Sequence, residues 1–366
     1  MEKFKLTHYP DFDAAAGYDF PGFDYIVSHG VYTWVNPSTR QSWRRFIDRH
    51  LKPGGLVYVS YNALPGRAAD LPLQRLVRAL GRSMPGNSQE QVAAALGVVD
   101  SLTDMKAPAL VSSPFATGLR EHRESLSLAY LAHEFMGADW EPLSVTDVRA
   151  DLADIGLKPA GSATLMQNYD GFVLGRVARE SLATIGDADA RELARDFLID
   201  QFFRRDVFIR DGGRLDENER RRRLLESTFF LSQPAAKVEY GISTSAGHLS
   251  FDNAAARHIV KALAAGPRRL ADIAEATIPD QNLLANALTL CASLAIWPVE
   301  SNRVPVANLN AAIYGRLGGA EEIHCVALPF GTALAVDRDQ LVRLRDGATP
   351  SIDERTSWVQ LQMSQL

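Results

Sequence analysis

The pattern of apolar and polar positions in the first third of the chain predicts a strand, a helix and a second strand. Residues 23–28 and 56–61 are short apolar runs, continuous enough for strands buried on both faces. Between them, Asn36-Pro37 is a helix start signal, and apolar positions then recur at helical spacing up to Leu51. Residues 52–55, Lys-Pro-Gly-Gly, end that helix. This order and these lengths predict a right-handed parallel crossover.

The next segment has mainly helical periodicity. Residues 71–135 predict helices with a polar break at 83–88, and residues 147–155 predict a helix that packs on the same sheet. Two runs at 157–165 and 171–177 predict an antiparallel hairpin that closes the sheet. A further short strand is predicted at residues 4–8.

The pattern changes after residue 178. Residues 187–203 and 214–230 predict two helices, and residues 204–210 between them fit a strand. Residues 252–294 then predict three helices, followed by a strand at 295–299. This order of elements resembles a winged helix.

Composition limits the class of protein. The 366 residues have a net charge of −5 and 46% hydrophobic residues, which excludes a disordered chain and gives no overall attraction to nucleic acid or anionic lipid. Cys291 and Cys325 lack the spacing of a zinc site or a disulfide framework. The start of the chain has no secretory leader pattern, and the most apolar stretch, residues 283–299, is too short and too polar for a membrane span. We therefore expect a cytoplasmic protein of two or three domains, at roughly 150 residues per domain.

Two segments follow the predicted strands at the edge where open α/β sheets bind ligands. Residues 28–34 follow the first strand, and Tyr61-Asn62 end the second. The same positions also fit a connecting loop with aromatic residues that pack in a core. Spacing alone leaves both interpretations open.

The motifs at these positions resemble a known family. FDYIV at 23–27 and LKPGG at 51–55, followed by a strand, resemble the fourth and fifth strands of class I S-adenosylmethionine-dependent methyltransferases. SHGVYTWV at 28–35 with VYVSYN at 57–62 resembles the bacterial branch that carries a methyltransferase regulatory domain and includes protein-lysine methyltransferases. Further similar segments are YLAHEF at 130–135, WEPL at 140–143, residues 151–166 and residues 191–210.

The resemblance implies an α/β fold with a partial Rossmann-like class I methyltransferase sheet and a helical insertion, followed by an α-rich C-terminal region with a winged-helix-like module. The implied domains are a remnant of the Rossmann-like domain at 1–105 and a methyltransferase regulatory region at 106–190, which includes the closing hairpin at 157–177. A C-terminal domain at 191–366 follows, with the winged-helix-like module at 252–300.

One part of the family pattern is absent from these 366 residues. The family has a Gly-rich turn after its first strand and an acidic residue at the end of its second, and no GxGxG or GxGxxG occurs here. If residues 4–8 correspond to the third strand, Asp11-Phe12 match the position that contacts adenine and the first two strands are missing. Residues 23–28 would then be an unpaired apolar edge strand. The resemblance therefore implies S-adenosylmethionine as cofactor, with its binding compromised in this chain.

The candidate site residues come from the two loops and from the matched family positions. Tyr32, Trp34 and Tyr61 could hold a lysine side chain through their aromatic faces, because methyl transfer mainly requires that two reactants be positioned. The amine, with an ordinary pKa of about 10.4, must first lose a proton, which His29 or Tyr32 could accept. The alternative is that these are packed aromatic residues and a hydrogen-bonded loop histidine. The candidate catalytic set is Tyr32, Trp34, His29, Tyr61 and Asn62, and the candidate cofactor-binding set is Asp11, Phe12, Ser28, His29 and Gly30.

Other chemical motifs are weaker. His133-Glu134 lacks the second histidine of a zinc-protease motif, since Gly137 stands there, and His324-Cys325 has no acidic partner for a thiol nucleophile. We expect no metal site, and we expect His133 at a domain contact. The arginines at 220–223 lie among acidic residues, which predicts an ion-paired, solvated helix face.

The helix at 280–294 bears no Arg or Lys that could reach a phosphate, so we expect a protein partner rather than nucleic acid or a membrane. A homodimer is left open. The predicted function is S-adenosylmethionine-dependent methylation of protein lysines. The alternative is a non-catalytic regulatory or interaction protein derived from a methyltransferase.

Overall fold

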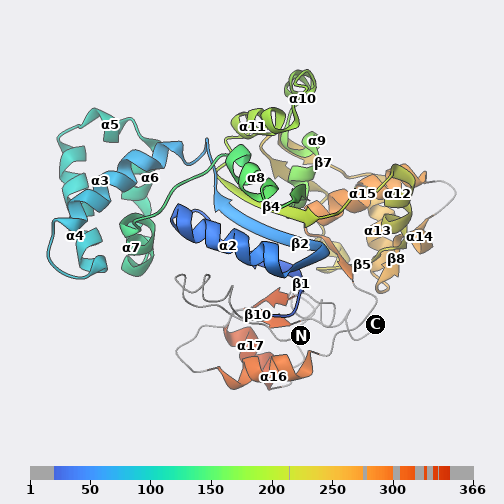
Figure 1. The fold of residues 1–366 in the computed structure, drawn as a ribbon. Coiled ribbons are helices and arrows are strands. Elements are labelled where there is room, and N and C mark those ends of the chain that lie inside the picture. The colour runs from blue at the N-terminus through green and yellow to red at the C-terminus, as the bar shows by residue number, and fades with distance from the viewer. Residues whose placement is uncertain are drawn as a thin grey trace. The chain divides into compact units, whose positions relative to one another are not determined.

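The computed structural model describes residues 20–213, 215–274, 278–299, 306–317, 325–327, 333–336 and 338–346. The chain divides into two compact units, Met1–Gly213 and Arg214–Leu366 (Figure 1). Residues 191–213 belong to the first unit, so the predicted domain boundary after residue 190 does not separate the compact units. The predicted strand at 4–8 and the candidates Asp11 and Phe12 lie outside the described residues.

The first unit contains a four-stranded sheet in the order β1-β2-β4-β3. Its strands are β1 (Phe23–Ser28), β2 (Leu51–Asn62), β3 (Leu157–Ser162) and β4 (Phe203–Arg210). β1 and β2 are parallel, and β4 runs antiparallel to both β2 and β3. The predicted parallel crossover is confirmed, and the fold is mixed α/β.

Helix α2 (Pro37–His50) connects the two parallel strands as the sequence predicts. The side chain of Asn36 caps its start by accepting a hydrogen bond from the Thr39 backbone N–H at 2.9 Å. Trp43, Phe46 and Ile47 on its buried face pack onto the sheet. These contacts fix the loop that leads from β1 into the helix.

One face of the sheet is covered, and the other is partly open. α2 and α8 (Val145–Ala153) bury apolar side chains against β1 and β2, in one core with Phe208 of β4. The predicted packing of the helix at 147–155 on this sheet is confirmed. On the opposite face of β1, Tyr25 and Val27 are 68% and 66% exposed. Within the described residues β1 pairs only with β2, so it is an edge strand.

The predicted closing hairpin at 157–177 is wrong. β3 pairs with β4, which comes about forty residues later in the chain. The segment predicted as the second hairpin strand instead forms α9 (Asp170–Val173) and the start of α10 (Arg176–Ala183). The Leu174 backbone N–H donates to the Asp170 carbonyl at 2.8 Å, and Val173 and Leu174 pack against Leu182 in a small separate core. This local helical bonding removes the segment from the sheet.

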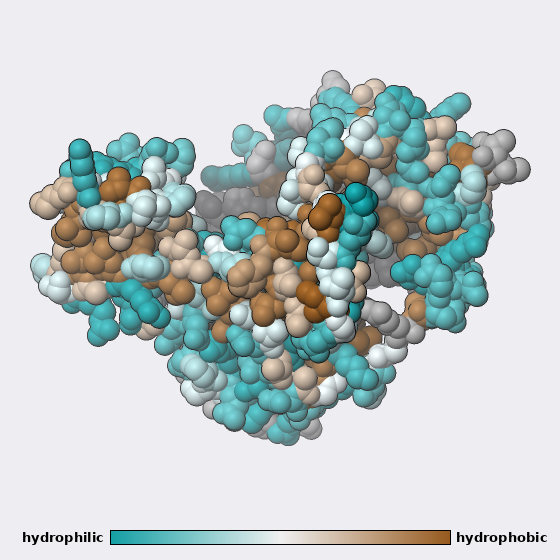
Figure 2. All heavy atoms as spheres, turned by 90° about the horizontal axis from the view of Figure 1, so that it is seen from above, coloured by the Kyte–Doolittle hydropathy of each residue, from teal (hydrophilic) through white to brown (hydrophobic). Residues whose placement is uncertain are grey.

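The predicted helical insertion is confirmed between β2 and α8. It consists of α3 (Leu71–Arg82), α4 (Ser88–Asp104), α5 (Pro108–Val111), α6 (Pro114–His122) and α7 (Leu128–Met136), with the short helices η2 (Ala68–Asp70) and η3 (Arg123–Ser125). These helices share a core of their own, separate from that of the sheet. Apolar side chains also reach the surface of the insertion (Figure 2), among them Met105, Val111, Leu126 and Leu128.

The remaining elements of the first unit follow α8 and β3. They are η4 (Leu165–Asn168) before α9, and α11 (Ala188–Leu198) after α10. α11 leads into β4, and its side chains Asp196 and Glu192 hydrogen-bond to Arg204 of that strand. The match of residues 191–210 to one family motif is therefore a helix and a strand that belong to this sheet.

The second unit begins with α12 (Glu217–Glu226) and β5 (Thr228–Leu231), so the last four residues of the predicted helix at 214–230 are mostly strand. It continues with η5 (Ala235–Lys237), β6 (Gly241–Thr244), β7 (Gly247–Ser250), α13 (Ala254–Leu263), β8 (Arg268–Arg269), α14 (Leu270–Ile273), α15 (Asp280–Ala292) and β9 (Ile296–Val299). The elements α16 (Ala307–Gly315), β10 (Cys325–Ala327), β11 (Ala333–Ala335) and α17 (Arg338–Arg345) complete the described part.

The second unit contains the predicted order of elements at 252–299 and the predicted ion-paired helix. The three helices and the strand expected at 252–299 are present in that order, and β9 pairs with β5 in a three-stranded sheet. The winged-helix assignment itself stays a prediction. On α12, Arg222 contacts both Glu219 and Glu226 at 2.8 Å, and Arg223 contacts Glu219 at 2.7 Å, which confirms the ion-paired face. Among the described helices of both units, none is long and apolar enough to cross a membrane.

Candidate functional site

The carboxyl ends of β1 and β2 lie side by side because the two strands are parallel, with Ser28 in register with Val59. The loop at 29–34 leaves β1 at this edge, and β2 continues there to Asn62. The helical insertion begins just beyond this edge of the sheet (Figure 1). The two segments that the sequence singled out therefore meet in the structure.

A polar cluster of His29, Tyr58 and Ser60 lies at this edge. The exposed His29 places Nδ1 3.0 Å from the Tyr58 hydroxyl and 3.2 Å from Ser60 Oγ, and its ring stacks on that of Tyr58. The Gly30 backbone N–H donates to Ser60 Oγ at 2.8 Å. Gly30 has φ +66°, a conformation that favours glycine, and an added Cβ there would meet open space. The backbone at Gly30 is thus accessible to a ligand.

Tyr58 and Ser60 were not predicted as site residues. They alternate with the buried Val57 and Val59 along β2, so they point to the opposite face of the sheet from α2. The period of two in VYVSYN was the signal that could have identified them. Ser28, predicted in the cofactor-binding set, is buried at the end of β1 directly before His29.

The structure places Tyr32 in the core rather than at the surface. Its side chain is buried, its ring packs edge-on against Trp43, and its hydroxyl donates to Asp151 Oδ2 at 2.6 Å. Burial, followed by the hydrogen bond and the negative charge of Asp151, raises the pKa of the Tyr32 hydroxyl far above its ordinary value. The phenol is therefore held protonated and away from solvent, which makes it a poor proton acceptor.

Tyr61 and Asn62 hydrogen-bond the end of β2 to neighbouring segments. Tyr61 is fully buried and its hydroxyl donates to Asp206 Oδ2 at 2.7 Å; burial, with the charge of Asp206 next, raises its pKa. The Asn62 backbone N–H donates to Thr33 Oγ1, and its carbonyl accepts from the Leu143 N–H. Their catalytic role stays a prediction, and the bonds the structure shows are those of a support for the β1 loop.

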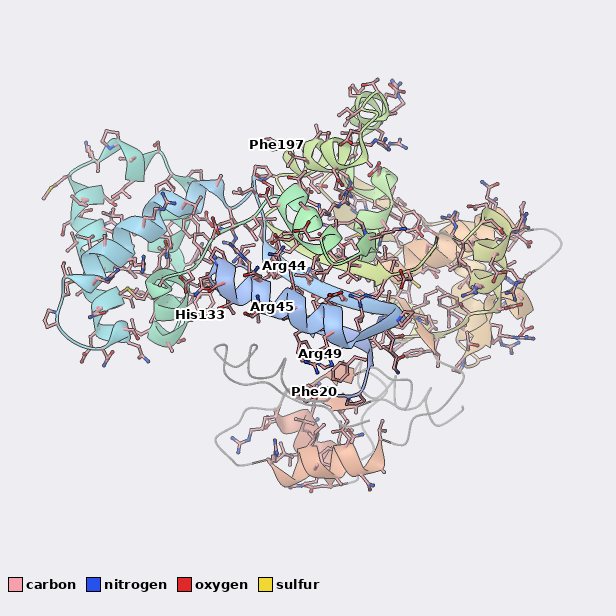
Figure 3. All side chains as sticks on the ribbon, in the orientation of Figure 1. Phe20, Arg44, Arg45, Arg49, His133 and Phe197 are labelled. Atoms are coloured by element: carbon pink, nitrogen blue, oxygen red, sulfur yellow. The ribbon has the colours of Figure 1, made fainter. Side chains whose placement is uncertain are left out.

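Trp34 joins this edge of the sheet to the helical insertion. Its ring stacks on His133 of α7 at a centroid distance of 4.4 Å and lies 6.0 Å from the ring of Trp140. Figure 3 shows His133 beside the start of α2, which follows Trp34. His133 therefore lies at a contact between the insertion and the sheet. Glu141, which follows Trp140 in the chain, stabilises the same contact, because its backbone N–H donates to the Thr33 carbonyl at 2.9 Å.

The site holds few groups that could ligate a metal. In the described parts of the chain no three His, Cys, Asp or Glu side chains gather in a way that could hold a metal ion. Cys291 is buried, and burial raises the pKa of its thiol to about 12. His324 of the other candidate pair lies outside the described residues. The arrangement offers one exposed imidazole and an open backbone at Gly30, while the hydroxyl groups of Tyr58 and the buried Ser60 contact the imidazole.

Part of the chain matches a protein-family model. Residues 127–210 match the family model described as "predicted methyltransferase regulatory domain". This segment runs from the start of α7 to the end of β4, so it includes the contact with Trp34 and overlaps the region predicted at 106–190 only in part.

Two curated relatives have no assigned activity. The uncharacterized protein sll1526 of Synechocystis sp. is 29% identical over 354 residues, which covers 93% of this chain and 70% of that protein. The uncharacterized protein RP789 of Rickettsia prowazekii is 24% identical over 213 residues, covering 54% of this chain and 36% of that protein.

Solved structures of PKMT2 from Rickettsia typhi share the fold. The complex of that protein with AdoHcy has a TM-score of 0.63 at 18% identity and covers 94% of this chain and 74% of PKMT2. A second structure of PKMT2 has a TM-score of 0.59 over 94% and 72% of the two chains. This chain is thus a methyltransferase-like protein in fold, and the resemblance inferred from its motifs is confirmed.

Proposed function

We propose that this chain transfers a methyl group from S-adenosylmethionine to the ε-amino group of lysine residues in a protein. The observation that carries the proposal is the meeting of His29, Tyr58, Ser60 and the open backbone of Gly30 at the carboxyl ends of two parallel strands. Ligands of open α/β sheets bind at this edge. The similarity in fold to PKMT2 and the match to the regulatory domain support the same class of reaction.

The chemistry requires a positioned amine and a proton acceptor. When bound, an S-adenosylmethionine-type cofactor supplies an electrophilic methyl group. The lysine Nζ would lose its proton and form the new N–C bond while the methyl–sulfur bond breaks and S-adenosylhomocysteine leaves. This chain would hold the nitrogen in line and accept the proton. If Nδ1–H of His29 donates to Ser60 Oγ or to the Tyr58 oxygen, Nε2 carries the lone pair that takes the proton. Tyr58 and Ser60 then act as positioning residues for the imidazole.

The chain has one feature that suits cofactor binding at this edge and lacks another. Gly30 lets a ligand approach the backbone at the end of β1, and His29 lies on the surface beside it. The 366 residues contain no Gly-rich turn of the GxGxG type, which would let the backbone close around the ligand. We therefore expect this chain alone to bind the cofactor weakly. Calorimetry with S-adenosylhomocysteine tests this, and a dissociation constant in the low micromolar range would contradict it.

Methyl transfer itself is tested at millimolar cofactor, where weak binding is overcome. The 366-residue chain is incubated with S-adenosylmethionine carrying a deuterated methyl group and a lysine-rich polypeptide, and mass spectrometry locates the label. We expect label on lysine Nζ and none on a polypeptide whose lysines have been acetylated. His29→Ala should lower kcat about 10²-fold or more, as expected for the loss of a general base. His122→Ala, which removes an exposed histidine of α6, is the matched control and should leave the rate unchanged.

A second candidate function is favoured by the edge of the sheet. Tyr25 and Val27 leave an apolar face exposed on β1, and such a surface can bind another protein without any chemistry. The alternative is therefore a non-catalytic interaction protein with a methyltransferase fold. Absence of label on every polypeptide at saturating cofactor, in a chain that still binds the polypeptide, would favour this alternative.

The second unit fits a role in recognition of the protein substrate. We propose that residues 252–300 form a winged-helix-like module that contacts protein, since α15 carries no Arg or Lys for a nucleic-acid backbone. Deletion of this unit should raise the KM for the polypeptide more than it lowers kcat. If the deletion weakened binding of nucleic acid as much as binding of the polypeptide, this role would be contradicted.

A further inference from the structure

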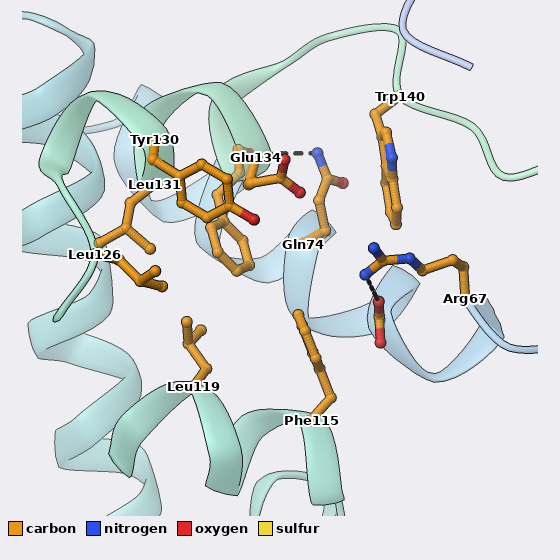
Figure 4. Close-up of a pocket in the computed structure, with 11 residues that line it drawn as sticks. Arg67, Gln74, Phe115, Leu119, Leu126, Tyr130, Leu131, Glu134 and Trp140 are labelled. Carbon is orange, nitrogen blue, oxygen red and sulfur yellow. Dashed lines mark hydrogen bonds and ion pairs between the residues drawn. The ribbon is translucent and has the colours of Figure 1, made fainter. Parts of the chain in front are cut away.

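A pocket of about 100 Å³ opens in the helical insertion, between η2, α3, α6 and α7 (Figure 4). Its walls are largely apolar and include Phe115, Leu119 and Phe135. Tyr130 and Glu134, one helical turn apart on α7, present their side chains to the same pocket. The proposed function makes no use of this pocket.

The charges in the pocket are unbalanced. Arg67 donates to Asp70 Oδ2 at 2.8 Å, and its guanidinium lies over the ring of Phe202, so the positive charge of Arg67 is already paired. Glu134 is half-buried, and no hydrogen bond or ion pair within the described residues reaches its carboxylate. Burial raises the pKa of Glu134, and the positive charges of His133 and Arg67 offset this only in part. A cation beside Glu134 would complete the balance.

Two donors at the pocket also lack acceptors. The indole Nε1–H of Trp140 and the Nε–H of Arg67 are buried, and neither has a hydrogen-bond partner among the described residues. Both residues line the pocket, but these two nitrogen atoms are shielded from it, so a bound ligand does not reach them unless the side chains move. The polar group that a ligand can pair with is the carboxylate of Glu134, and an ammonium group would satisfy it.

The pocket is small enough to suit a single side chain, with a volume of about 100 Å³. An apolar wall suits the methylene chain of a lysine, and the ring of Tyr130 beside Glu134 suits its ammonium group through a cation–π contact.

We propose that this pocket binds a lysine side chain of a polypeptide, with the ammonium group at Glu134 and Tyr130 and the backbone near Trp140 and Arg67. Two features favour a polypeptide over a free amine. The ring of Phe202, which is 59% exposed, extends the surface beyond Arg67, and Trp140 continues from the pocket to Trp34 at the end of the sheet. That the polypeptide is the methyl acceptor rests on the proposed function, whereas the binding itself does not.

The test measures binding of a fluorescent peptide to the full chain without any cofactor. One peptide carries a single lysine, and its control carries norleucine, which has the same apolar stem without the ammonium group. We expect the lysine peptide to bind at least tenfold more tightly, and Glu134→Gln and Tyr130→Ala each to weaken it at least fivefold. Glu121→Gln, an exposed carboxylate on α6 outside the pocket, is the matched control and should change nothing.

The outcomes test the lysine pocket and the proposed methyl transfer separately. Equal binding of the lysine and norleucine peptides, or no effect of Glu134→Gln, would overturn the pocket even if lysines are methylated. Free lysine that competes as well as the peptide would overturn the assignment to a polypeptide. Lysine-dependent binding that Glu134→Gln abolishes supports the pocket, and if no methyl transfer is found in the same preparation, only the proposed function fails.

Discussion

Replacement of Arg204 by methionine should destabilise the first unit strongly, because Arg204 is the cation at the centre of a buried acidic cluster. Its side chain is 6% exposed; Nε donates to Asp206 Oδ2 at 2.9 Å and Nη2 to Glu192 Oε1 at 2.8 Å, and Nη1 bonds Asp196. Asp206 also accepts the hydroxyl of Tyr61, so the cluster connects β4 to the end of β2. Methionine keeps most of the apolar stem and removes only the charge and the donors.

The expected loss of stability follows from the burial of the carboxylates that Arg204 contacts. Removal of one member of a buried ion pair costs about 3–5 kcal/mol, because the remaining charge stays buried without compensation. Arg176→Met is the matched control, since Arg176 is 74% exposed and its pair with Glu180 lies on the surface of α10. Exposed pairs contribute about 0–1 kcal/mol. Out of a total stability of about 5–15 kcal/mol, the Arg204 variant should lose a large fraction and the control almost nothing.

The assay is hydrogen exchange as a function of urea, read by mass spectrometry on peptides that cover 51–62 and 203–210. These peptides report on β2 and β4, so unfolding of the second unit does not obscure the result. If unpaired carboxylates are the cause, Arg204→Met combined with Asp196→Asn should recover part of the loss. A loss for Arg204→Met no larger than that for Arg176→Met, or no recovery in the double variant, would refute the reasoning.

Three further predictions concern stability and role. Burial raises the pKa of Asp196 to about 7, so between about pH 7 and 4 the native state binds a proton that the unfolded state does not. This proton makes the folded state more stable as the pH falls from 7 towards 4. Urea unfolding at pH 5 and pH 8 should show this gain in the parent chain and not in Asp196→Asn. Asn36→Ala removes the cap of α2 and should cost about 1 kcal/mol, seen as a lower urea midpoint, whereas an unchanged midpoint would mean that the cap contributes nothing. Tyr32→Phe removes the donor to Asp151 and should cost about 1.5–3 kcal/mol while methyl transfer at millimolar cofactor persists; loss of transfer in a folded variant would instead make Tyr32 catalytic.

Local signals identified the elements whose stabilising contacts are close in sequence. The cap at Asn36 and the apolar face of α2 act within a few residues, and the structure confirms both. Residues 52–55 were expected to separate the helix from the strand, but they lie within β2, which begins at Leu51 directly after α2 ends at His50. The hairpin at 157–177 failed because apolar runs of this length fit a strand and a short helix equally well. The true partner of β3 is β4, and no local feature of residues 157–162 indicates a strand that starts at Phe203.

The candidate site could be located but not resolved from the sequence. Parallel pairing of β1 and β2 brings residues 28–34 to Asn62, as expected from the crossover. The burial of Tyr61 could not be predicted, because its partner Asp206 lies 145 positions away along the chain. The pocket in the insertion likewise joins Arg67, Phe115 and Glu134 from three elements. Such sites depend on tertiary packing, which periodicity does not reveal.

The central claim is that the carboxyl ends of β1 and β2 form the methyl-transfer site. The most direct measurement is hydrogen–deuterium exchange of the 366-residue chain with and without millimolar S-adenosylhomocysteine. We predict slower exchange in peptides that cover residues 28–34 and 56–62, and little change in α4 and α6. Unchanged exchange in both of these segments at saturating ligand, or protection confined to the helical insertion, would contradict the account.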